Sequence, residues 1–193
     1  MSLQNKQPES KQLLAKYWAT GKKFHAKTSS FIKKYNNKII VIKYGGYALT
    51  KPALLKSFAK NISLLNQLGI KVIVVHGGGP QIEKELKKRK INNEEYQGLR
   101  VTTKSVLGVV KRILSHDLNK LISDEIKKNG GKTKRLNGVS TKVLKAKIAM
   151  NGNIGFVGEP RGIDKNIIMK ALKSNHIPII APLGVHANNN TLN

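Results

Sequence analysis

Two short stretches of the chain decide its fold: residues 39–46 read IIVIKYGG, and residues 72–80 read VIVVHGGGP. Each opens with a continuous run of β-branched residues, which is typical of a strand buried in a parallel sheet, and each run stops at glycines. Between the two runs, apolar residues recur at helical spacing from Lys51 to Leu68, and Gly69 follows as a helix stop. These successive strand, loop and helix units predict an α/β fold with a mostly parallel sheet, helices on both faces and right-handed crossovers.

The rest of the chain continues this alternation and adds one hairpin. A helix is expected to open at Pro80, because proline is favoured in the first helical turn, and a longer one spans Ser105 to Lys128. Asn151-Gly152 favours the tight turn of a β-hairpin between strands at Val143–Ala149 and Ile154–Val157. The remaining expected elements are a strand at 132–137, a helix at 167–174 and a buried strand at 178–181.

The composition excludes several classes of protein. Without cysteine, the chain has no disulfide framework, no thiolate zinc site and no thiol nucleophile. Its five His residues fall into no ligand pattern, so no metal site is expected. No apolar run approaches the roughly 18 residues of a membrane-spanning helix, and the N-terminus is too polar for a signal peptide. We therefore expect a cytoplasmic protein without a membrane partner.

The formal charge of +26 comes from 36 Lys and Arg residues against 10 Asp and Glu residues. Such an excess suggests a polyanionic partner, because clustered basic side chains bind phosphate backbones by releasing counterions. The basic residues are nevertheless spread over the whole chain, and 31 of them are Lys, whereas base readout favours Arg. We hypothesise that A/T-rich coding bias, which also enriches Asn and Ile, produced most of the excess. No specific nucleic-acid partner is expected, and non-specific binding stays the less favoured alternative.

Two glycine clusters, Gly45-Gly46 and Gly77-Gly78-Gly79, follow the carboxyl ends of their strands, where α/β sheets collect ligands. Glycines let backbone N–H groups approach an anion, and a helix that starts behind them adds its positive end. Neither a P-loop nor a dinucleotide-binding fingerprint is present, so two interpretations stay open at this point. Either the loops bind a phosphate or carboxylate, or the glycines only make tight turns between strand and helix.

The chain contains five short motifs: IKYGG at 42–46, VHGGGPQI at 75–82, GLRVT at 98–102, GFVGE at 155–159 and IIAPLG at 179–184. In order and spacing, these motifs together resemble the acetylglutamate kinases of the amino-acid kinase family. The likeness extends from about Ile39 to Asn193. It implies ATP-dependent phosphorylation of the side-chain carboxylate of N-acetyl-L-glutamate in arginine biosynthesis, with Mg²⁺ accompanying ATP. It also implies an incomplete three-layer α/β sandwich in which the hairpin is a lid over the substrate.

The resemblance assigns roles at the first strand. Lys43 matches the lysine that stabilises the transferring phosphoryl group, where a compact positive charge opposes the charge that develops in the transfer. Gly45 and Gly46 would offer N–H groups to the nucleotide phosphates. His76 is interpreted as a structural residue at a strand end, because the attacking carboxylate needs no deprotonation at neutral pH.

The resemblance also assigns the substrate site. Gly78 and Gly79 match the loop that binds N-acetylglutamate, and Arg100 matches the arginine that clamps its α-carboxylate through two-point contact. Asn193 matches a substrate-binding asparagine and is the final residue of the sequence. In the family, the catalytic aspartate and the ATP-binding half follow that asparagine, so we expect this chain to be inactive alone. A catalytically dead N-acetylglutamate-binding or regulatory module is the alternative.

The chain divides into two regions in this interpretation. Residues 1–37 are a basic N-terminal extension with helical spacing, and residues 38–193 are the acetylglutamate-binding part of the kinase domain. The extension resembles the helix that links dimers into hexamers in arginine-regulated members, which implies a homo-oligomer, either a dimer or a hexamer. An amphipathic segment of this kind could equally cap its own sheet.

Overall fold

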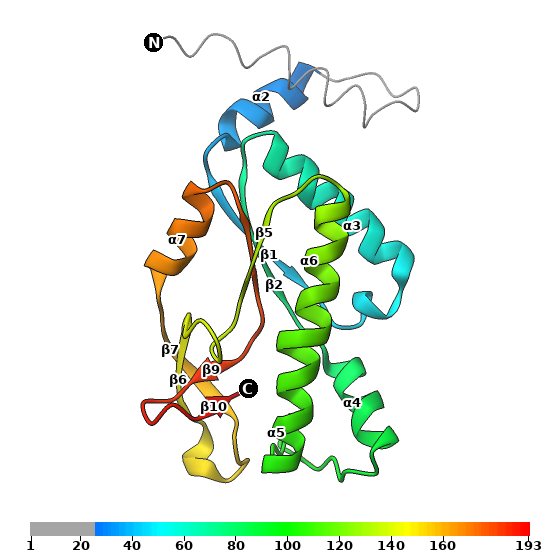
Figure 1. Cartoon of the computed structure of the whole chain (residues 1–193), viewed down its shortest axis with the longest axis vertical. Helices are drawn as coiled ribbons and strands as arrows, with labels where there is room; N and C mark the ends of the chain where they lie inside the picture. Colours follow the sequence, from blue (N-terminus) through cyan, green and yellow to red (C-terminus); the bar gives the residue numbers. More distant parts are fainter. Residues whose placement is uncertain (1–25) are drawn as a thin grey trace.

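Within residues 26–193, which the computed structural model describes, four parallel strands form the central sheet (Figure 1). Their order is β1 (Ile39–Tyr44), β2 (Lys71–His76), β8 (Ile177–Ile180) and β5 (Thr133–Leu136). All neighbouring pairs are parallel. The predicted α/β class with a parallel sheet is confirmed, and the predicted strands at 39–42, 72–75, 132–137 and 178–181 correspond to β1, β2, β5 and β8.

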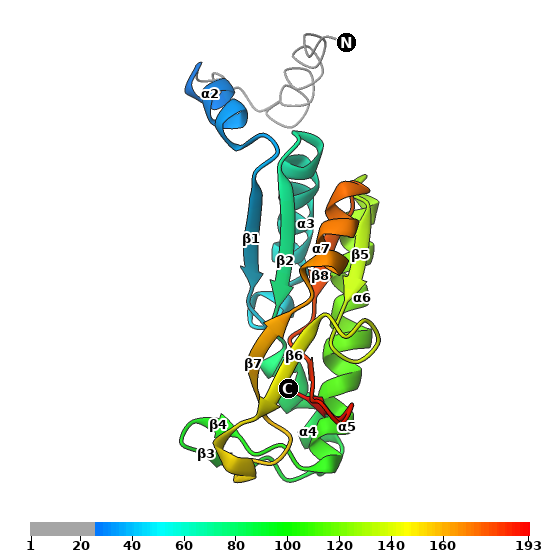
Figure 2. The same cartoon turned by 90° about the vertical axis from the view of Figure 1, so that its left-hand side faces the viewer.

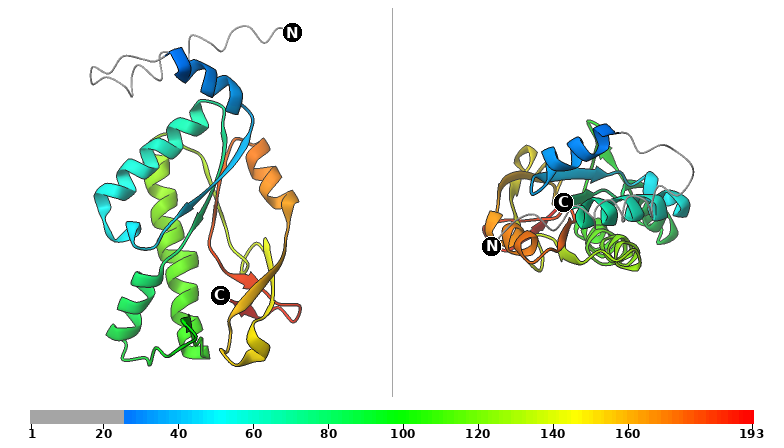
Figure 3. Two further views of the ribbon diagram at one scale, coloured as in Figure 1. Left: turned by 180° about the vertical axis from the view of Figure 1, so that it is seen from behind. Right: turned by 90° about the horizontal axis from the view of Figure 1, so that it is seen from above.

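Helices cover both faces of this sheet, as the sequence predicts. Along β2, successive side chains point to opposite faces, so Val72 and Val74 enter the core under α3 and α6, whereas Ile73 enters a second core under α7. Figure 3 shows α3 and α6 on one side of the strands and α7 on the other. The helices are α2 (Ala26–Tyr35), η1 (Ala48–Thr50), α3 (Pro52–Gln67), α4 (Gly79–Lys88), α5 (Lys104–Lys111), η2 (Arg112–Leu118), α6 (Asn119–Lys128) and α7 (Lys165–Lys173).

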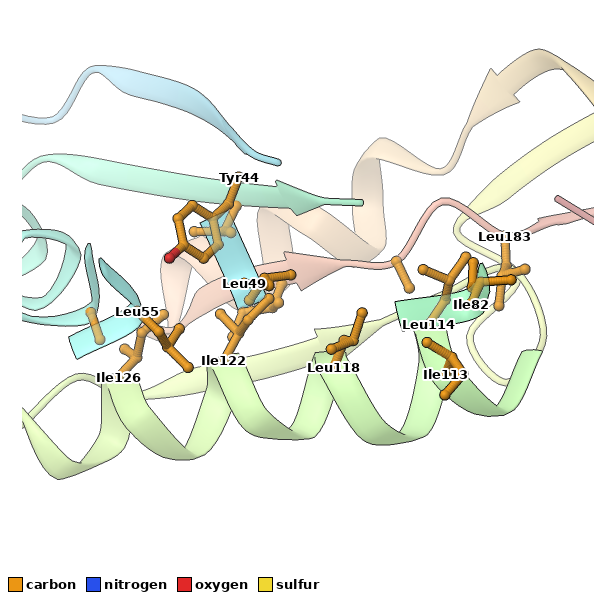
Figure 4. Packing of buried hydrophobic residues seen from close by; sticks show 14 of the residues in the cluster. Tyr44, Leu49, Leu55, Ile82, Ile113, Leu114, Leu118, Ile122, Ile126 and Leu183 are labelled. Atoms are coloured by element: carbon orange, nitrogen blue, oxygen red, sulfur yellow. The ribbon is translucent and has the colours of Figure 1, made fainter. Parts of the chain in front are cut away.

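The long helix expected at 105–128 is present, but it is not a uniform α-helix. A seven-residue π-helical segment, η2, joins α5 to α6 without breaking the rod. Side chains of η2 line the core under α3 and α6, which we call the first core, together with residues of β1, α3 and α4, as Figure 4 shows. The residues of this rod in that view are Ile113, Leu114, Leu118, Ile122 and Ile126.

Strand β1 differs from the expectation that its apolar run would be buried on both faces. Ile40 and Ile42 pack against the first core, but Ile39 and Val41, on the opposite face, are 45% and 63% exposed. The reason is position: β1 is the edge strand of the described sheet, and α7 packs on β8. The β-branched run therefore signals a strand but not its burial.

A second, smaller sheet lies beyond the carboxyl ends of the central strands (Figure 2). Its order is β10 (Thr191–Leu192), β9 (Gly184–Val185), β6 (Leu144–Ile148) and β7 (Gly158–Ile163), with β6 and β7 antiparallel. The hairpin is thus present, but the prediction of its second strand at Ile154–Val157 is wrong. Those residues belong to the connection, which includes η3 (Met150–Gly152) with Asn151 and Gly152 at positive φ.

Ile154 is fully buried in the connection, next to the isolated bridge between Thr102 and Gly155, and this burial explains why an apolar residue stands there. A small hairpin of β3 (Glu95–Tyr96) and β4 (Leu99–Arg100) precedes that bridge. Most of the expected extension at 1–37 lies outside the described residues, and its described part contains the helix α2. In the part of the chain from residue 26 onward, no helix is long and apolar enough to cross a membrane.

Candidate functional site

The two glycine clusters leave the central sheet at the same edge. Tyr44 and His76, the last residues of β1 and β2, are register partners, and the Gly77 nitrogen donates to the Tyr44 carbonyl over 3.0 Å. Because the strands are parallel, their carboxyl ends open toward the half of the molecule that holds the second sheet and the C-terminus (Figure 2). This is the position at which α/β sheets bind ligands.

The backbones of the two loops touch. A Cβ atom on Gly46 would lie 2.8 Å from the Gly78 nitrogen and 3.0 Å from the Gly79 nitrogen. By contrast, no described atom lies within 4 Å of a Cβ built on Gly45 or on Gly79, and both residues are exposed. Gly46 is therefore required by packing, whereas Gly45 and Gly79 lie at open, exposed positions.

Helix α4 begins at this contact. Gly78 is its N-cap residue and Pro80 lies in its first turn, and no described side chain caps the helix. The first turn of a helix has N–H groups without intrahelical partners and carries partial positive charge. The Gly78-Gly79 loop therefore places a helix start without a side-chain cap beside Gly46, in an arrangement suited to an anion.

Gln81 ties the two loops together, and sequence reasoning assigned it no role. Its Nε2 donates to the Gly46 carbonyl over 2.9 Å, and its Oε1 is buried without a partner among the described residues. The only signal in the sequence is its place in the VHGGGPQI motif.

His76 and Asn119 lie directly behind the Gly77–Gly79 loop. His76 is 1% exposed, and burial lowers the pKa of its imidazole below the ordinary 6.5, an effect that a hydrogen bond to Gly77 opposes. A neutral, buried ring agrees with the structural role expected for this residue. Asn119, which is also buried, was missed, because it looks like an ordinary polar position in a long helix.

Lys43 lies in β1 on the same face as Ile39 and Val41, and its side chain is exposed. It is the residue directly before Tyr44, so it stands one residue ahead of the glycine loop. It forms no ion pair with any residue from 26 to 193. Its ammonium group is thus available at the sheet edge.

The chain near Arg100 and the backbone of Asn193 both bond to the hairpin connection. Arg100, in β4, donates from Nη1 to Asn93 Oδ1 over 2.9 Å. Two residues further, the Thr102 carbonyl accepts from the Phe156 nitrogen over 2.8 Å, and the Phe156 carbonyl accepts from the Asn193 nitrogen over 3.1 Å. Asn193 therefore bonds directly to the segment at residues 154–158, and Arg100 precedes by two residues a threonine that does.

The side chain of Asn193 carries a buried Oδ1 atom that has no partner among the described residues. Its backbone is fixed on both sides, since its carbonyl accepts from the Gly158 nitrogen over 2.9 Å. Five of the predicted site residues therefore lie at the ends of β1 and β2, and the other two, Arg100 and Asn193, lie on the side of the hairpin connection. The first five are Lys43, Gly45, Gly46, Gly78 and Gly79. Helix α5 runs between these two sets of residues: Thr103 caps its N-terminus, and Leu114, just beyond its C-terminus, packs on Gly78.

The metal-ligating potential of the site is small. Residues 26–193 contain no group of three or more His, Asp or Glu side chains that could hold a metal ion. A metal that accompanies a nucleotide is bound largely by the phosphates and water.

A sequence profile of the Amino acid kinase family matches residues 38–193. The chain belongs to the amino acid kinase family. The family suggested by the five motifs is confirmed. Within the family, the chain is 40% identical over 174 residues to the acetylglutamate kinase of Psychrobacter cryohalolentis and 38% identical over 163 residues to that of Campylobacter hominis.

These alignments cover 84% of this chain and 58% of each relative, so the chain spans just under three fifths of the relatives' length. Solved structures share the amino acid kinase fold. Smu.665 from Streptococcus mutans UA159 superposes with a TM-score of 0.70 at 29% identity, over 80% of this chain and 62% of that one. N-acetylglutamate synthase from Neisseria gonorrhoeae, complexed with coenzyme A and N-acetyl-glutamate, superposes with a TM-score of 0.73 over 86% and 38%. At 21% identity, the second likeness shows the fold alone.

Proposed function

We propose that this chain provides the N-acetyl-L-glutamate-binding part of an acetylglutamate kinase. The observation that carries the proposal is the contact between the two glycine loops, which brings the uncapped start of α4 against the loop that follows Lys43 and Tyr44. The identity to named acetylglutamate kinases supports this choice of substrate. The activity belongs to the cytoplasm, where ATP is available.

In the complete enzyme, a side-chain carboxylate oxygen of N-acetyl-L-glutamate attacks the γ-phosphorus of ATP. The bond between that phosphorus and ADP breaks, and an acyl phosphate forms. Two anions must meet, so catalysis consists mainly of positioning and charge stabilisation. ATP carries Mg²⁺ with it, and no resident metal is required of this chain.

Each residue near β1 has a part in that task. Lys43 opposes the negative charge on the transferring group, and Gly45 and Gly46 donate N–H groups to the phosphates. Gly46 also keeps the nucleotide loop in contact with the substrate loop, because it has no side chain to separate its backbone from that of Gly78.

The remaining residues hold the acceptor. Gly78 and Gly79 donate to the substrate at the start of α4, and Arg100 binds its α-carboxylate with a planar fork of N–H donors. Asn193 places an amide next to the hairpin connection, where its unpartnered Oδ1 can accept a hydrogen bond from the acetamido N–H.

Binding is tested by isothermal titration calorimetry of N-acetyl-L-glutamate into the full chain. We expect saturable binding that is lost in Arg100→Ala and kept in Arg135→Ala, an exposed arginine on β5. Loss of binding in both variants, or in neither, contradicts the role given to Arg100.

Turnover is tested separately, with a coupled assay for acyl phosphate. The chain is assayed alone and with a separately expressed C-terminal part of a related acetylglutamate kinase. Activity in the second mixture supports the kinase assignment, and no turnover in either mixture contradicts it. Binding without turnover favours the alternative, a binding or regulatory module.

The division into an extension at 1–37 and a kinase part at 38–193 also remains a proposal, as does assembly into dimers or hexamers through the extension. Light scattering of the full chain and of a chain that starts at residue 38 tests both. A smaller assembly in the shorter chain supports the role of the extension.

A further inference from the structure

A buried amide and a buried imidazole connect three elements behind the Gly77–Gly79 loop. Asn119 Nδ2 lies 3.2 Å from His76 Nε2 and donates to the Ile179 carbonyl over 3.0 Å. Asn119 is 0% exposed and His76 is 1% exposed. The first residue of α6 is therefore hydrogen-bonded to the last residue of β2 and to β8.

The hydrogen-bond partners assign the protons of His76. Its Nδ1 lies 3.1 Å from the Gly77 carbonyl oxygen. A carbonyl oxygen only accepts, so Nδ1 carries the proton, and Nε2 is the unprotonated acceptor that faces the Asn119 donor. A single neutral tautomer satisfies both contacts.

This contact fixes the direction of a donor in the loop. The Gly77 carbonyl and the Gly78 N–H belong to the same peptide plane and point in opposite directions, because the peptide is trans. When His76 holds the carbonyl on the protein side, the Gly78 N–H points away from His76. The Gly78 nitrogen is the atom that lies 2.8 Å from a Cβ built on Gly46.

The π-helical segment η2 packs on the same loop. A Cβ atom on Gly78 would lie 2.6 Å from Leu118 Cδ1 and 2.7 Å from Leu114 Cδ2, so both leucines pack directly on this glycine. Asn119 follows Leu118 as the first residue of α6. One residue more or less in a helix rotates all later side chains about the helix axis by about 100°. The π-helical segment therefore sets the rotation that brings Leu118 and Asn119 to the loop.

We propose that Asn119 and His76 are positioning residues that orient the Gly77–Gly79 loop for its ligand. The role in ligand binding rests on the proposed function, in which Gly78 and Gly79 donate to N-acetyl-L-glutamate. The role in loop geometry stands without any ligand.

The test compares Asn119→Ala with Ser123→Ala. Ser123 lies one turn further along α6, is also 0% exposed, and its Oγ lies 2.7 Å from Thr133 Oγ1, away from the glycine loops. Both variants remove one buried hydrogen-bonding group, so both should lower the melting temperature. Only Asn119→Ala removes a group that acts on the loop.

The first measurement uses the ligand-free chain and ¹⁵N NMR. We expect His76 to be neutral with its proton on Nδ1, and the Gly78 and Gly79 amide signals to shift in Asn119→Ala but not in Ser123→Ala. Unchanged amide signals in Asn119→Ala, or equal shifts in the control, overturn the inference. This result does not depend on whether N-acetyl-L-glutamate binds.

The second measurement is the affinity for N-acetyl-L-glutamate. We expect a loss of about tenfold in Asn119→Ala and in His76→Phe, which keeps the ring volume but removes both nitrogens. His76→Asn keeps an N–H donor at the Nδ1 position and should bind more tightly than His76→Phe, even where it is the less stable variant. Affinity that simply follows stability across these variants overturns the positioning role. Absence of binding in the unsubstituted chain contradicts the proposed function alone, and the NMR result still decides the inference.

Discussion

The backbone of Gly46 touches the backbone of Gly78, and this contact joins the loops at the carboxyl ends of two parallel strands. It leaves no room for a side chain on Gly46, while the neighbouring Gly45 faces open space. The same two-residue cluster therefore contains one glycine that the fold needs and one that lies at an open, exposed position.

Gly46→Ala should destabilise the chain much more than Gly45→Ala. The new methyl group at Gly46 meets backbone atoms, which cannot move aside as a side chain can, so a loss of about 1–3 kcal/mol is expected, typical of overpacking. Urea unfolding of both variants measures the difference. Equal losses contradict the close approach of the two loops.

His76 should make stability depend on pH just below neutrality. Its pKa is lowered in the folded chain by burial, so the unfolded state binds more protons between the ordinary pKa of 6.5 and the lower folded value. The contribution of His76 to the free energy of unfolding should therefore be constant above pH 6.5. Below pH 6.5 the free energy of unfolding should fall as the pH drops, by at most about 1.4 kcal/mol per pH unit. Urea unfolding of the chain and of His76→Asn across this range measures the effect, and parallel curves contradict it.

Gln81→Glu should be costly, because it replaces the amide donor to the Gly46 carbonyl with a carboxylate that repels it. The loss should be about 1–3 kcal/mol, as for a buried polar group without a partner. Gln67→Glu is a matched control, since Gln67 Nε2 also donates to a backbone carbonyl, that of Asn129, but at an exposed site. Thermal unfolding should show a small decrease in melting temperature for the control and a larger decrease for Gln81→Glu. The reverse order would show that Gln81 does not hold the loops together.

Val41→Thr and Val74→Thr should separate the edge of the sheet from its centre. Val74 is 0% exposed in β2, so a hydroxyl there is buried without water and should cost about 1–3 kcal/mol. Val41 is 63% exposed in β1, and the same change there should stay within about 0.5 kcal/mol. Chemical denaturation of the two variants provides the comparison. A large loss at Val41 would mean that this face of β1 is covered in solution.

Local features of the sequence determined most of the fold. The β-branched runs that became β1 and β2, and the helical spacing that became α3, depend on neighbours within one or two turns of chain. Glycines after both strands likewise indicated the edge at which the candidate site lies. The motifs were sufficient for the family because each is a short contiguous stretch.

Tertiary structure alone decided the features that depend on residues far apart in the chain. β7 (Gly158–Ile163) has two glycines and a proline and shows no strand pattern, and only its pairing with β6 makes it a strand. Ile154 stands at a position that is buried in a connection, not in a strand. The exposure of Val41, the π-helical segment and the reach of Asn119 to His76 are likewise set by which element packs against which. Periodicity reports whether a residue belongs to a strand or a helix, because that choice is local. It does not report which neighbour covers that residue, because long-range packing makes that choice.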